Sequence, residues 1–246
     1  MADVLVLCYH AVSERWPAPL SVTPEALEAQ LELLVRRGYR GATFESVVSE
    51  RPAERTLVVT FDDAFASVGE LAAPILRRLG LPGSVYVVSD HPAAPERPMS
   101  WDGIDQWLGT EHEHELRPLS WDRIGELAEA GWEVGSHTGS HPHLSRVRDE
   151  AELARELEGS RATLEDRLGL PCRTLAYPYG DHDERVVEAT GRAGYTGAST
   201  LPGRFPKPTP LAWPRVGIYR ADDMRRFRMK VARPVRALRA TPLWPG

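Results

Sequence analysis

Two adjacent carboxylates, Asp62 and Asp63, follow the short apolar run 57–60 in a chain of 246 residues. Such a run, bounded by charge, is typical of a strand buried on both faces of a parallel sheet, and parallel sheets bind ligands at the carboxyl ends of their strands. Successive strand side chains point to opposite sides, so the two aspartates cannot serve one purpose in one way. This segment alone equally favours a reactive strand end and a helix N-cap, because aspartate is also a good cap.

Other polar groups also follow predicted strands, namely His10, His137, His141 and the turn 177–180 (Tyr-Pro-Tyr-Gly). If the strands are parallel, these groups meet Asp62 and Asp63 at one face of the domain. Two imidazoles and one carboxylate are a ligand set that zinc uses in open, catalytic sites. One aspartate could then bind the cation while its neighbour stays free as a base. For a lone histidine such as His10, a structural hydrogen-bonding role is the alternative.

The elements that must position these groups alternate along the chain, which is the signature of βα units. Strands are predicted at 4–9, 57–60, 84–88, 132–136, 174–177, 195–199 and 215–219, with helices at 24–37, 43–50, 68–79, 120–130, 149–168 and 183–193. Residues 89–119 interrupt this rhythm and are predicted to be an insertion over one face of the domain. Within it, the acidic and histidine-bearing run 111–115 is interpreted as a solvated loop rather than a metal-binding tract, and residues 100–102 as a helix start.

Composition indicates a single soluble domain, with 42% hydrophobic and 26% charged residues. A net charge of −5 disfavours nucleic acid as a partner. No stretch approaches the roughly 20 apolar residues of a membrane span, and the first apolar run is too short for a signal peptide, so we expect a cytoplasmic protein. Cys8 and Cys172 lie in strand-like runs and are predicted to be buried thiols rather than a disulfide.

Three segments resemble the first three motifs of the polysaccharide deacetylases, also called the NodB-homology domain or carbohydrate esterase family 4. They are 60–64 (Thr-Phe-Asp-Asp-Ala), 137–141 (His-Thr-Gly-Ser-His) and 177–180. The resemblance implies a distorted (β/α) barrel and metal-dependent hydrolysis of the N-acetyl amide of an N-acetylated sugar. It extends from Tyr9 to about Arg215, so we assign residues 1–220 to the catalytic domain and 221–246 to a basic C-terminal helix or tail.

The resemblance also implies a role for each motif residue. Asp62 would be the general base, and Asp63, His137 and His141 would hold one divalent ion, zinc with cobalt or nickel as alternatives. The backbone N–H of Tyr179 would face the developing oxyanion. The predicted substrate contacts are Tyr177, Pro178 and Tyr179.

Two departures from the family pattern concern the residues around the base. Ala176 stands where the third motif usually has an arginine that orients the catalytic aspartate, and no histidine follows His182 to supply the usual late catalytic acid. The start Tyr-His-Ala-Val at 9–12 is similar to the poly-N-acetylglucosamine deacetylase subgroup, in which the first strand supplies the acid. We therefore predict His10 as the general acid and Arg215 as the replacement arginine, with a surface or strand-end arginine as the alternative.

Two other functions remain open from the sequence. One is hydrolysis of a C–N bond in a small amide, and the other is carbohydrate binding without catalysis, which the intact set of acids and histidines disfavours. Segment 225–239 holds seven basic residues and no acid. It is predicted to be either a solvated basic helix or a peripheral anchor on an anionic leaflet, near sugars on a lipid or nucleotide carrier. The sequence indicates neither the sugar nor the oligomeric state.

Overall fold

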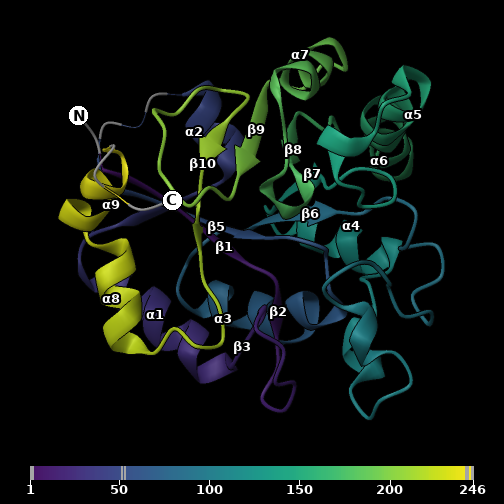
Figure 1. The fold of residues 1–246 in the computed structure, drawn as a ribbon. Coiled ribbons are helices and arrows are strands. Elements are labelled where there is room, and N and C mark those ends of the chain that lie inside the picture. Colours follow the sequence, from purple (N-terminus) through teal and green to yellow (C-terminus); the bar gives the residue numbers. More distant parts are fainter. Residues whose placement is uncertain (1–2, 51, 53, 242–243, 245–246) are drawn as a thin grey trace.

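A computed structural model of the chain describes residues 3–50, 52, 54–241 and 244 (Figure 1). Its central sheet has only parallel neighbours. The strands lie in the order β10 (Trp213–Pro214), β9 (Gly197–Thr200), β8 (Thr174–Ala176), β7 (Glu133–Ser136), β6 (Ser84–Val87), β5 (Thr56–Phe61), β1 (Val4–Tyr9) and β11 (Val216–Gly217), with β4 (Arg40–Ala42) also paired to β5. The predicted distorted (β/α) barrel is confirmed.

One short segment, 213–217, nearly closes the barrel. Its first half, β10, pairs with β9 at one edge of the sheet, and its second half, β11, pairs with β1 at the other edge. Arg215 lies between the two halves and donates its backbone N–H to Thr200 O. The strand predicted near 215–219 is present as the shorter β11, but β10 and its pairing with the opposite edge of the sheet were not predicted.

Helices surround the strands, as the alternating pattern predicts. They are α1 (Pro24–Arg36), α2 (Phe44–Ser49), α3 (Ala73–Arg78), α4 (Trp121–Glu129), α5 (Glu150–Ala154), α6 (Ser160–Leu168), α7 (Glu184–Arg192), α8 (Met224–Val231) and α9 (Arg233–Arg239). Side chains of Thr23, Ser120 and Asp183 cap α1, α4 and α7. Two π-helical turns, η1 (Val68–Ala72) before α3 and η5 (Arg155–Gly159) between α5 and α6, were not predicted.

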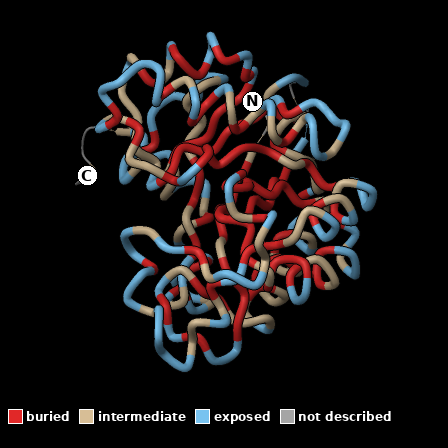
Figure 2. The backbone as a smooth tube through the Cα atoms, turned by 90° about the vertical axis from the view of Figure 1, so that its right-hand side faces the viewer, coloured by how far each residue is buried: buried red, intermediate tan, exposed pale blue. Residues whose placement is uncertain are grey.

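The buried core follows the strands through the centre of the molecule (Figure 2). All six residues of β5 are buried, as expected for a parallel strand covered on both faces. The register of β1 on β5 pairs Tyr9 with Phe61, and Asp62 donates its backbone N–H to Tyr9 O. The two strands therefore end at the same level, which brings His10 beside Asp62.

The insertion 89–119 contains two short 3₁₀ turns, η2 (Asp105–Trp107) and η3 (Glu113–Leu116). The helix start predicted at 100–102 was wrong, since a turn follows there and Gly103 adopts a φ of 103°. The insertion is anchored by the buried side chains of Met99, Ile104 and Leu116. These contacts hold the insertion against the carboxyl side of the barrel.

The described part of the C-terminal segment packs against the barrel as α8 and α9. Phe227 and Val231 are buried in the main core, and Arg236 forms an ion pair with Asp3. The last part of the predicted tail, at 242–243 and 245–246, lies outside the described residues. Both cysteines are buried and free, as predicted. Among the described helices, none has the length and apolar character needed to cross a bilayer.

Candidate metal-dependent hydrolytic site

Asp63, His137 and His141 converge at the carboxyl ends of β5 and β7. Asp63 Oδ1 lies 3.3 Å from Nε2 of His137 and 3.3 Å from Nε2 of His141. All three residues are buried. The structure therefore brings together the three residues that the sequence predicts as metal ligands, although residues 137 and 63 are distant along the chain.

The donor set and its unsatisfied atoms fit a divalent cation. Asp63 Oδ1 is buried and accepts no hydrogen bond from the part of the chain that the structure describes. His137 Nδ1 lies 2.7 Å from Ala176 O, so Nδ1 carries the proton and Nε2 presents its lone pair toward Asp63. A carbonyl partner on the far ring nitrogen is typical of metal-ligating histidines. The cluster fits the zinc, cobalt or nickel ion that the sequence predicts.

The loop that carries His141 is held by side chains on both sides. Ser136 Oγ accepts from the backbone N–H of Thr138, and Thr138 Oγ1 accepts from that of His141. The carboxylate of Glu156, on the π-helical turn η5, accepts from both the N–H (2.9 Å) and the hydroxyl (2.7 Å) of Ser140. A role for Glu156 was not predicted. The sequence signal for it is an acidic residue next to Leu157, on the face of the predicted helix that points toward the core.

Backbone strain is concentrated at these strand ends. Among the described residues, every non-glycine residue with a positive φ lies in this region: Asp63, Ala64, Thr138, His141 and Tyr179. This conformation is costly for residues with a Cβ and persists where the surroundings impose it, which is frequent at functional sites. The pattern supports a functional reading of the cluster.

Asp62, which lies next to Asp63 in the chain, is held by Arg215. The guanidinium donates from Nη1 to Oδ1 and from Nη2 to Oδ2, each at 2.6 Å, and both side chains are buried. Burial alone would raise the pKa of Asp62, but the Arg215 guanidinium outweighs it and holds the pKa at about 2. Asp62 is therefore an ionised carboxylate in a fixed orientation. Arg215 contacts the aspartate that the motifs predict as the base, and its role as the replacement arginine stays a prediction.

A second group of ligand-type atoms, from Cys8, His10 and Asp62, does not fit a cation. The three atoms lie within 4.8 Å of one another, and Cys8 Sγ donates to Asp62 Oδ2 at 3.3 Å. However, Arg215 already supplies a full positive charge to both oxygens of Asp62. Burial also raises the pKa of the Cys8 thiol well above its ordinary value, which disfavours the thiolate that a metal needs.

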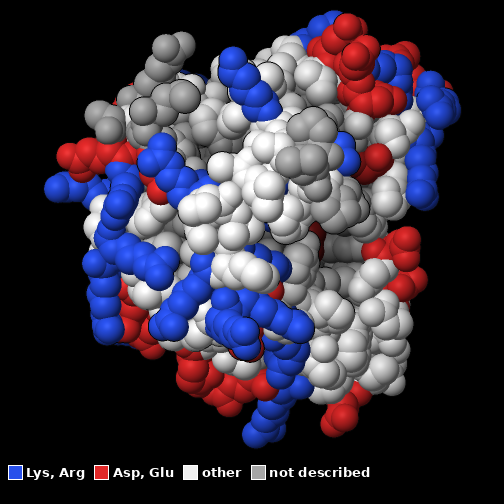
Figure 3. Space-filling model, turned by 60° about the vertical axis from the view of Figure 1, so that its left-hand side comes forward, with Lys and Arg blue, Asp and Glu red and all other residues white. Residues whose placement is uncertain are grey.

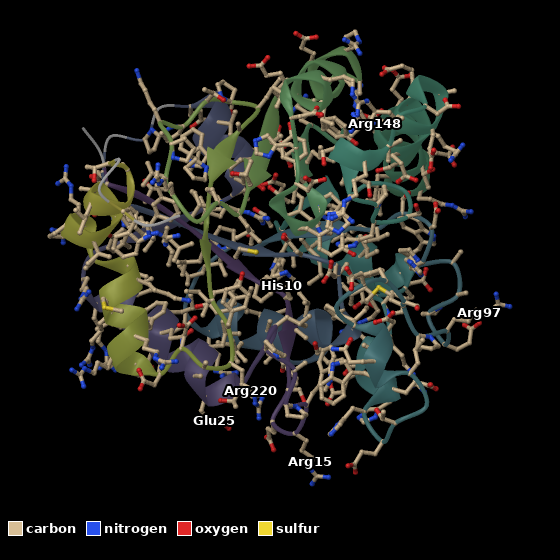
Figure 4. All side chains as sticks on the ribbon, viewed as in Figure 1. His10, Arg15, Glu25, Arg97, Arg148 and Arg220 are labelled. Atoms are coloured by element: carbon tan, nitrogen blue, oxygen red, sulfur yellow. The ribbon has the colours of Figure 1, made fainter. Side chains whose placement is uncertain are left out.

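His10 and both aspartates open into one cavity of about 290 Å³. His10 is partly exposed and lies near the middle of the view, whereas Arg15 and Arg97 lie at its periphery (Figure 4). His10 Nδ1 is buried without a hydrogen-bond partner among the described residues. A larger cleft of about 630 Å³, between α3 and α4, contains none of these reactive groups.

The insertion forms one wall of the cavity that His10, Asp62 and Asp63 line, which is called the catalytic cavity below. The ring of Trp101 stacks on His141 with centroids 4.3 Å apart, and the Tyr179 hydroxyl donates to Asp102 O. Of the predicted substrate contacts, Tyr179 lines the cavity, whereas Tyr177 is buried and donates its hydroxyl to Leu211 O. Pro178 is also buried and does not line the cavity. Trp101 was not predicted.

Replacing Arg215 with Met is expected to lower the free energy of unfolding by about 3–5 kcal/mol, because it leaves the buried Asp62 carboxylate without its partner. Urea unfolding at neutral pH measures this loss. The double variant Asp62→Asn/Arg215→Met should be less destabilised than the sum of the two single variants, since the uncompensated charge is gone. A loss below about 1 kcal/mol for Arg215→Met, the range of an exposed pair, would show that the ion pair is not buried as described.

The fold and the position of the cluster first define a class: a (β/α) barrel with reactive groups at the carboxyl ends of its strands. A family model described as polysaccharide deacetylase matches residues 49–198, more than half of the chain. The chain therefore belongs to the polysaccharide deacetylase family, as its motifs predict.

Curated relatives carry names from the same family. YxkH of Bacillus subtilis, named as a polysaccharide deacetylase, is 24% identical over 208 residues, which cover 82% of this chain and 66% of the relative. The poly-beta-1,6-N-acetyl-D-glucosamine N-deacetylase of Staphylococcus aureus strain MRSA252 is 23% identical over 186 residues, which cover 71% and 59%. The chain thus spans somewhat less than two thirds of the length of these relatives.

Solved structures share the fold. The polysaccharide deacetylase BC0361 from Bacillus cereus is 26% identical with a TM-score of 0.73, over 94% of this chain and 69% of that chain. The Streptococcus pyogenes deacetylase PplD, solved in complex with acetate, has a TM-score of 0.77 at 20% identity, over 94% and 99%. IcaB from Ammonifex degensii has a TM-score of 0.75 at 23% identity, over 96% and 98%. These likenesses support the barrel architecture.

Proposed function

We propose that this chain is a metal-dependent carbohydrate N-deacetylase, which hydrolyses the N-acetyl amide of an N-acetylated sugar and releases acetate. The observation that carries the proposal is that the two aspartates have different partners. Asp63 faces two histidines and Asp62 faces a guanidinium, and both aspartates line the same cavity. Family membership and the names of the curated relatives support a glycan of the N-acetylglucosamine type or a carrier-linked aminosugar as substrate.

In this proposal Asp63, His137 and His141 hold the divalent ion. A zinc ion bound there would supply Lewis acidity toward the acetyl carbonyl and toward water. Asp62 accepts the proton of the attacking water, and the two hydrogen bonds from Arg215 keep its carboxylate in the orientation that this transfer needs. Asp62 Oδ2 accepts from both Arg215 and Cys8, whereas Oδ1 accepts only from Arg215 among the described residues and keeps a second lone pair for the water.

His10 and Tyr179 complete the proposed reaction. An amine departs poorly as an anion, so protonated His10 donates a proton to the amide nitrogen as the C–N bond breaks. His10 lines the cavity beside Asp62, which is the position this step requires. The backbone N–H of Tyr179 donates to the oxygen that becomes negative during attack. The left-handed conformation of Tyr179 supports a fixed orientation of that N–H.

Acetate release tests the function directly. We expect the zinc-loaded protein to release acetate from chitooligosaccharides or from poly-β-1,6-N-acetylglucosamine, with one free amine formed for each acetate. Turnover of small linear or cyclic amides without turnover of either glycan would favour the alternative C–N hydrolase, for which the wall formed by Trp101 is the supporting observation. Binding of glycans without any turnover would indicate a non-catalytic carbohydrate-binding protein.

We also propose a peripheral contact with anionic lipid at the inner face of the membrane. On α8 and α9, Met229 and Leu238 are 57% and 45% exposed, and Arg225, Arg228 and Arg233 beside them are also exposed. Lys and Arg side chains gather on this face (Figure 3). Apolar groups among cations are what an anionic bilayer surface attracts.

Liposome flotation tests this contact. The protein is expected to float with vesicles rich in phosphatidylserine at low salt and to lose most of this binding at 0.5 M salt, because surface charges are screened. The variant Met229→Asp should bind less at low salt, whereas Glu158→Gln, an exposed change on η5, should bind as the parent does. Failure to float at low salt would contradict the contact.

A further inference from the structure

A second cavity adjoins the catalytic cavity and has the opposite charge character. It measures about 470 Å³ and shares Leu201 and Tyr219 with the catalytic cavity. Its lining includes three cations and no acid, namely Arg215, Lys230 and Arg239. The catalytic cavity, in contrast, is lined by Asp62, Asp63 and Asp102. A substrate that spans both would place a neutral amide over the acids and an anionic group over the bases.

Two of the three cations already have a buried counter-ion. Arg215 pairs with Asp62, and Lys230 Nζ lies 2.5 Å from Asp222 Oδ2. Arg239 instead donates to the carbonyls of Pro202 and Gly203 at 2.9–3.1 Å. No carboxylate of the described residues lies within ion-pair distance of Arg239. The Arg239 guanidinium can therefore bind an anion.

Aromatic rings fix the position of Arg239. Its guanidinium carbon lies 4.0 Å from the ring centroid of Phe205 and 5.9 Å from that of Trp244. Burial lowers the pKa of Arg239, opposed by the nearby Tyr219 phenol, so a bound anion would relieve the cost of keeping this charge away from water. A guanidinium that is held rigidly loses little freedom when it binds.

Tyr219 connects the two cavities. The His10 ring stacks near it with centroids 6.5 Å apart, and Lys230 Nζ lies 5.0 Å from the Tyr219 ring centroid. A sugar whose amide nitrogen lies at His10 can therefore extend past Tyr219 toward Lys230 and Arg239. The substituent that follows the sugar ring enters the basic cavity.

We propose that this basic cavity is a phosphate subsite and that the substrate is an N-acetylated aminosugar carrying a phosphate. The inference rests on the proposed deacetylase function and narrows its substrate class. The carbonyls of Pro202 and Gly203 take the Nε and Nη2 donors of Arg239, and Nη1 has no partner among the described residues, so Nη1 supplies the charge-assisted N–H donors for a phosphate oxygen. Lys230, although paired with Asp222, lies in the same lining. The exposed arginines of α8 make the surrounding face attractive to anions (Figure 3).

The test compares kcat/KM for N-acetylglucosamine 1-phosphate with kcat/KM for the neutral methyl glycoside of N-acetylglucosamine. The parent protein is expected to favour the phosphate by at least about tenfold, equivalent to about 1.4 kcal/mol. Arg239→Gln should bring this ratio close to one. Because Arg239 also anchors α9, a second variant, Val235→Glu, places an acid in the cavity lining and should lower the ratio while leaving Arg239 in place. The control Arg148→Gln, an exposed change in the loop before α5 and outside the lining, should keep the parent's ratio.

The outcomes separate this inference from the function on which it rests. Equal turnover of both substrates by the parent would overturn the phosphate subsite and leave the deacetylase standing. If the parent turns over neither substrate, the subsite is tested by ³¹P NMR titration of the metal-free protein with methyl phosphate. Binding that Val235→Glu weakens supports the subsite, and absence of binding overturns it. A further preference for a vesicle-bound, lipid-linked sugar phosphate would identify a lipid carrier, whereas equal use of the free sugar phosphate would identify a soluble one; both support the subsite.

Discussion

Asp62→Asn is expected to lower kcat by about 10²- to 10⁴-fold while leaving one equivalent of metal bound, because asparagine cannot accept the proton of the attacking water. Its amide has nearly the size of the carboxylate, and Asp62 contacts Arg215 rather than the metal cluster. The measurement is acetate release together with metal content by atomic emission on the same sample.

Asp122→Asn is the matched control for this prediction, since Asp122 is an exposed aspartate in the first turn of α4. It should keep both the turnover and the metal content of the parent. Near-normal turnover in Asp62→Asn would mean that another group takes the proton. Loss of metal from Asp62→Asn would mean that this carboxylate is a ligand, so the two aspartates would not have separate roles.

Asp63→Ala and His137→Ala are expected to lose both bound metal and turnover. Changes beyond the ligands of a metal typically weaken binding by about 10- to 100-fold, so removal of a ligand itself should weaken it by more than about 100-fold. Zinc affinity is measured by competition with a chromophoric chelator. The parent, stripped by a chelator, should be inactive and should recover on addition of one equivalent of zinc.

His114→Ala controls for the general effect of losing a histidine. His114 lies in the insertion, where its Nδ1 is 2.9 Å from Glu111 O, and it is not part of the described ligand cluster. This variant should bind zinc as the parent does. Parent-like zinc affinity in His137→Ala would place the metal elsewhere, and a loss of affinity in His114→Ala would implicate the run 111–115 that we interpret as a solvated loop.

Much of this site follows from local sequence patterns, and the reason is geometric. Parallel strands end at one face, so the sequence alone predicts that the polar residues just after β5 and β7 meet. The same rule predicted that His10, after β1, would lie on this face, and the pairing of β1 with β5 places it beside Asp62.

The closure of the barrel by segment 213–217, which holds Arg215, could not be predicted from the residues of that segment alone. A single strand over 215–219 fits the apolar pattern, but closure of the barrel divides the segment 213–217 between β9 and β1. Which edge a short strand joins depends on the whole sheet rather than on its own residues. The family resemblance suggested that Arg215 orients Asp62. The position of Arg215 between β10 and β11, where the barrel nearly closes, explains how a residue so late in the chain reaches Asp62.

Glu156 and Trp101 were missed for different physical reasons. Glu156 lies three residues after Leu153, so helical spacing places it on the inward face, but the spacing cannot show that its carboxylate contacts Ser140, because the two residues meet only in the folded barrel. Trp101 lies in an insertion without periodicity. Its stacking on His141 depends on the burial of Met99 and Ile104, which only the folded insertion provides.

The most direct test of the central claim is anomalous diffraction from crystals of the zinc-loaded protein, recorded on both sides of the zinc absorption edge. We predict one peak at about 2.0–2.2 Å from an Asp63 oxygen and from Nε2 of His137 and His141, with both Asp62 oxygens still bound to Arg215. A zinc peak outside this cluster, or coordination by Asp62, would contradict the assignment of separate roles to the two aspartates.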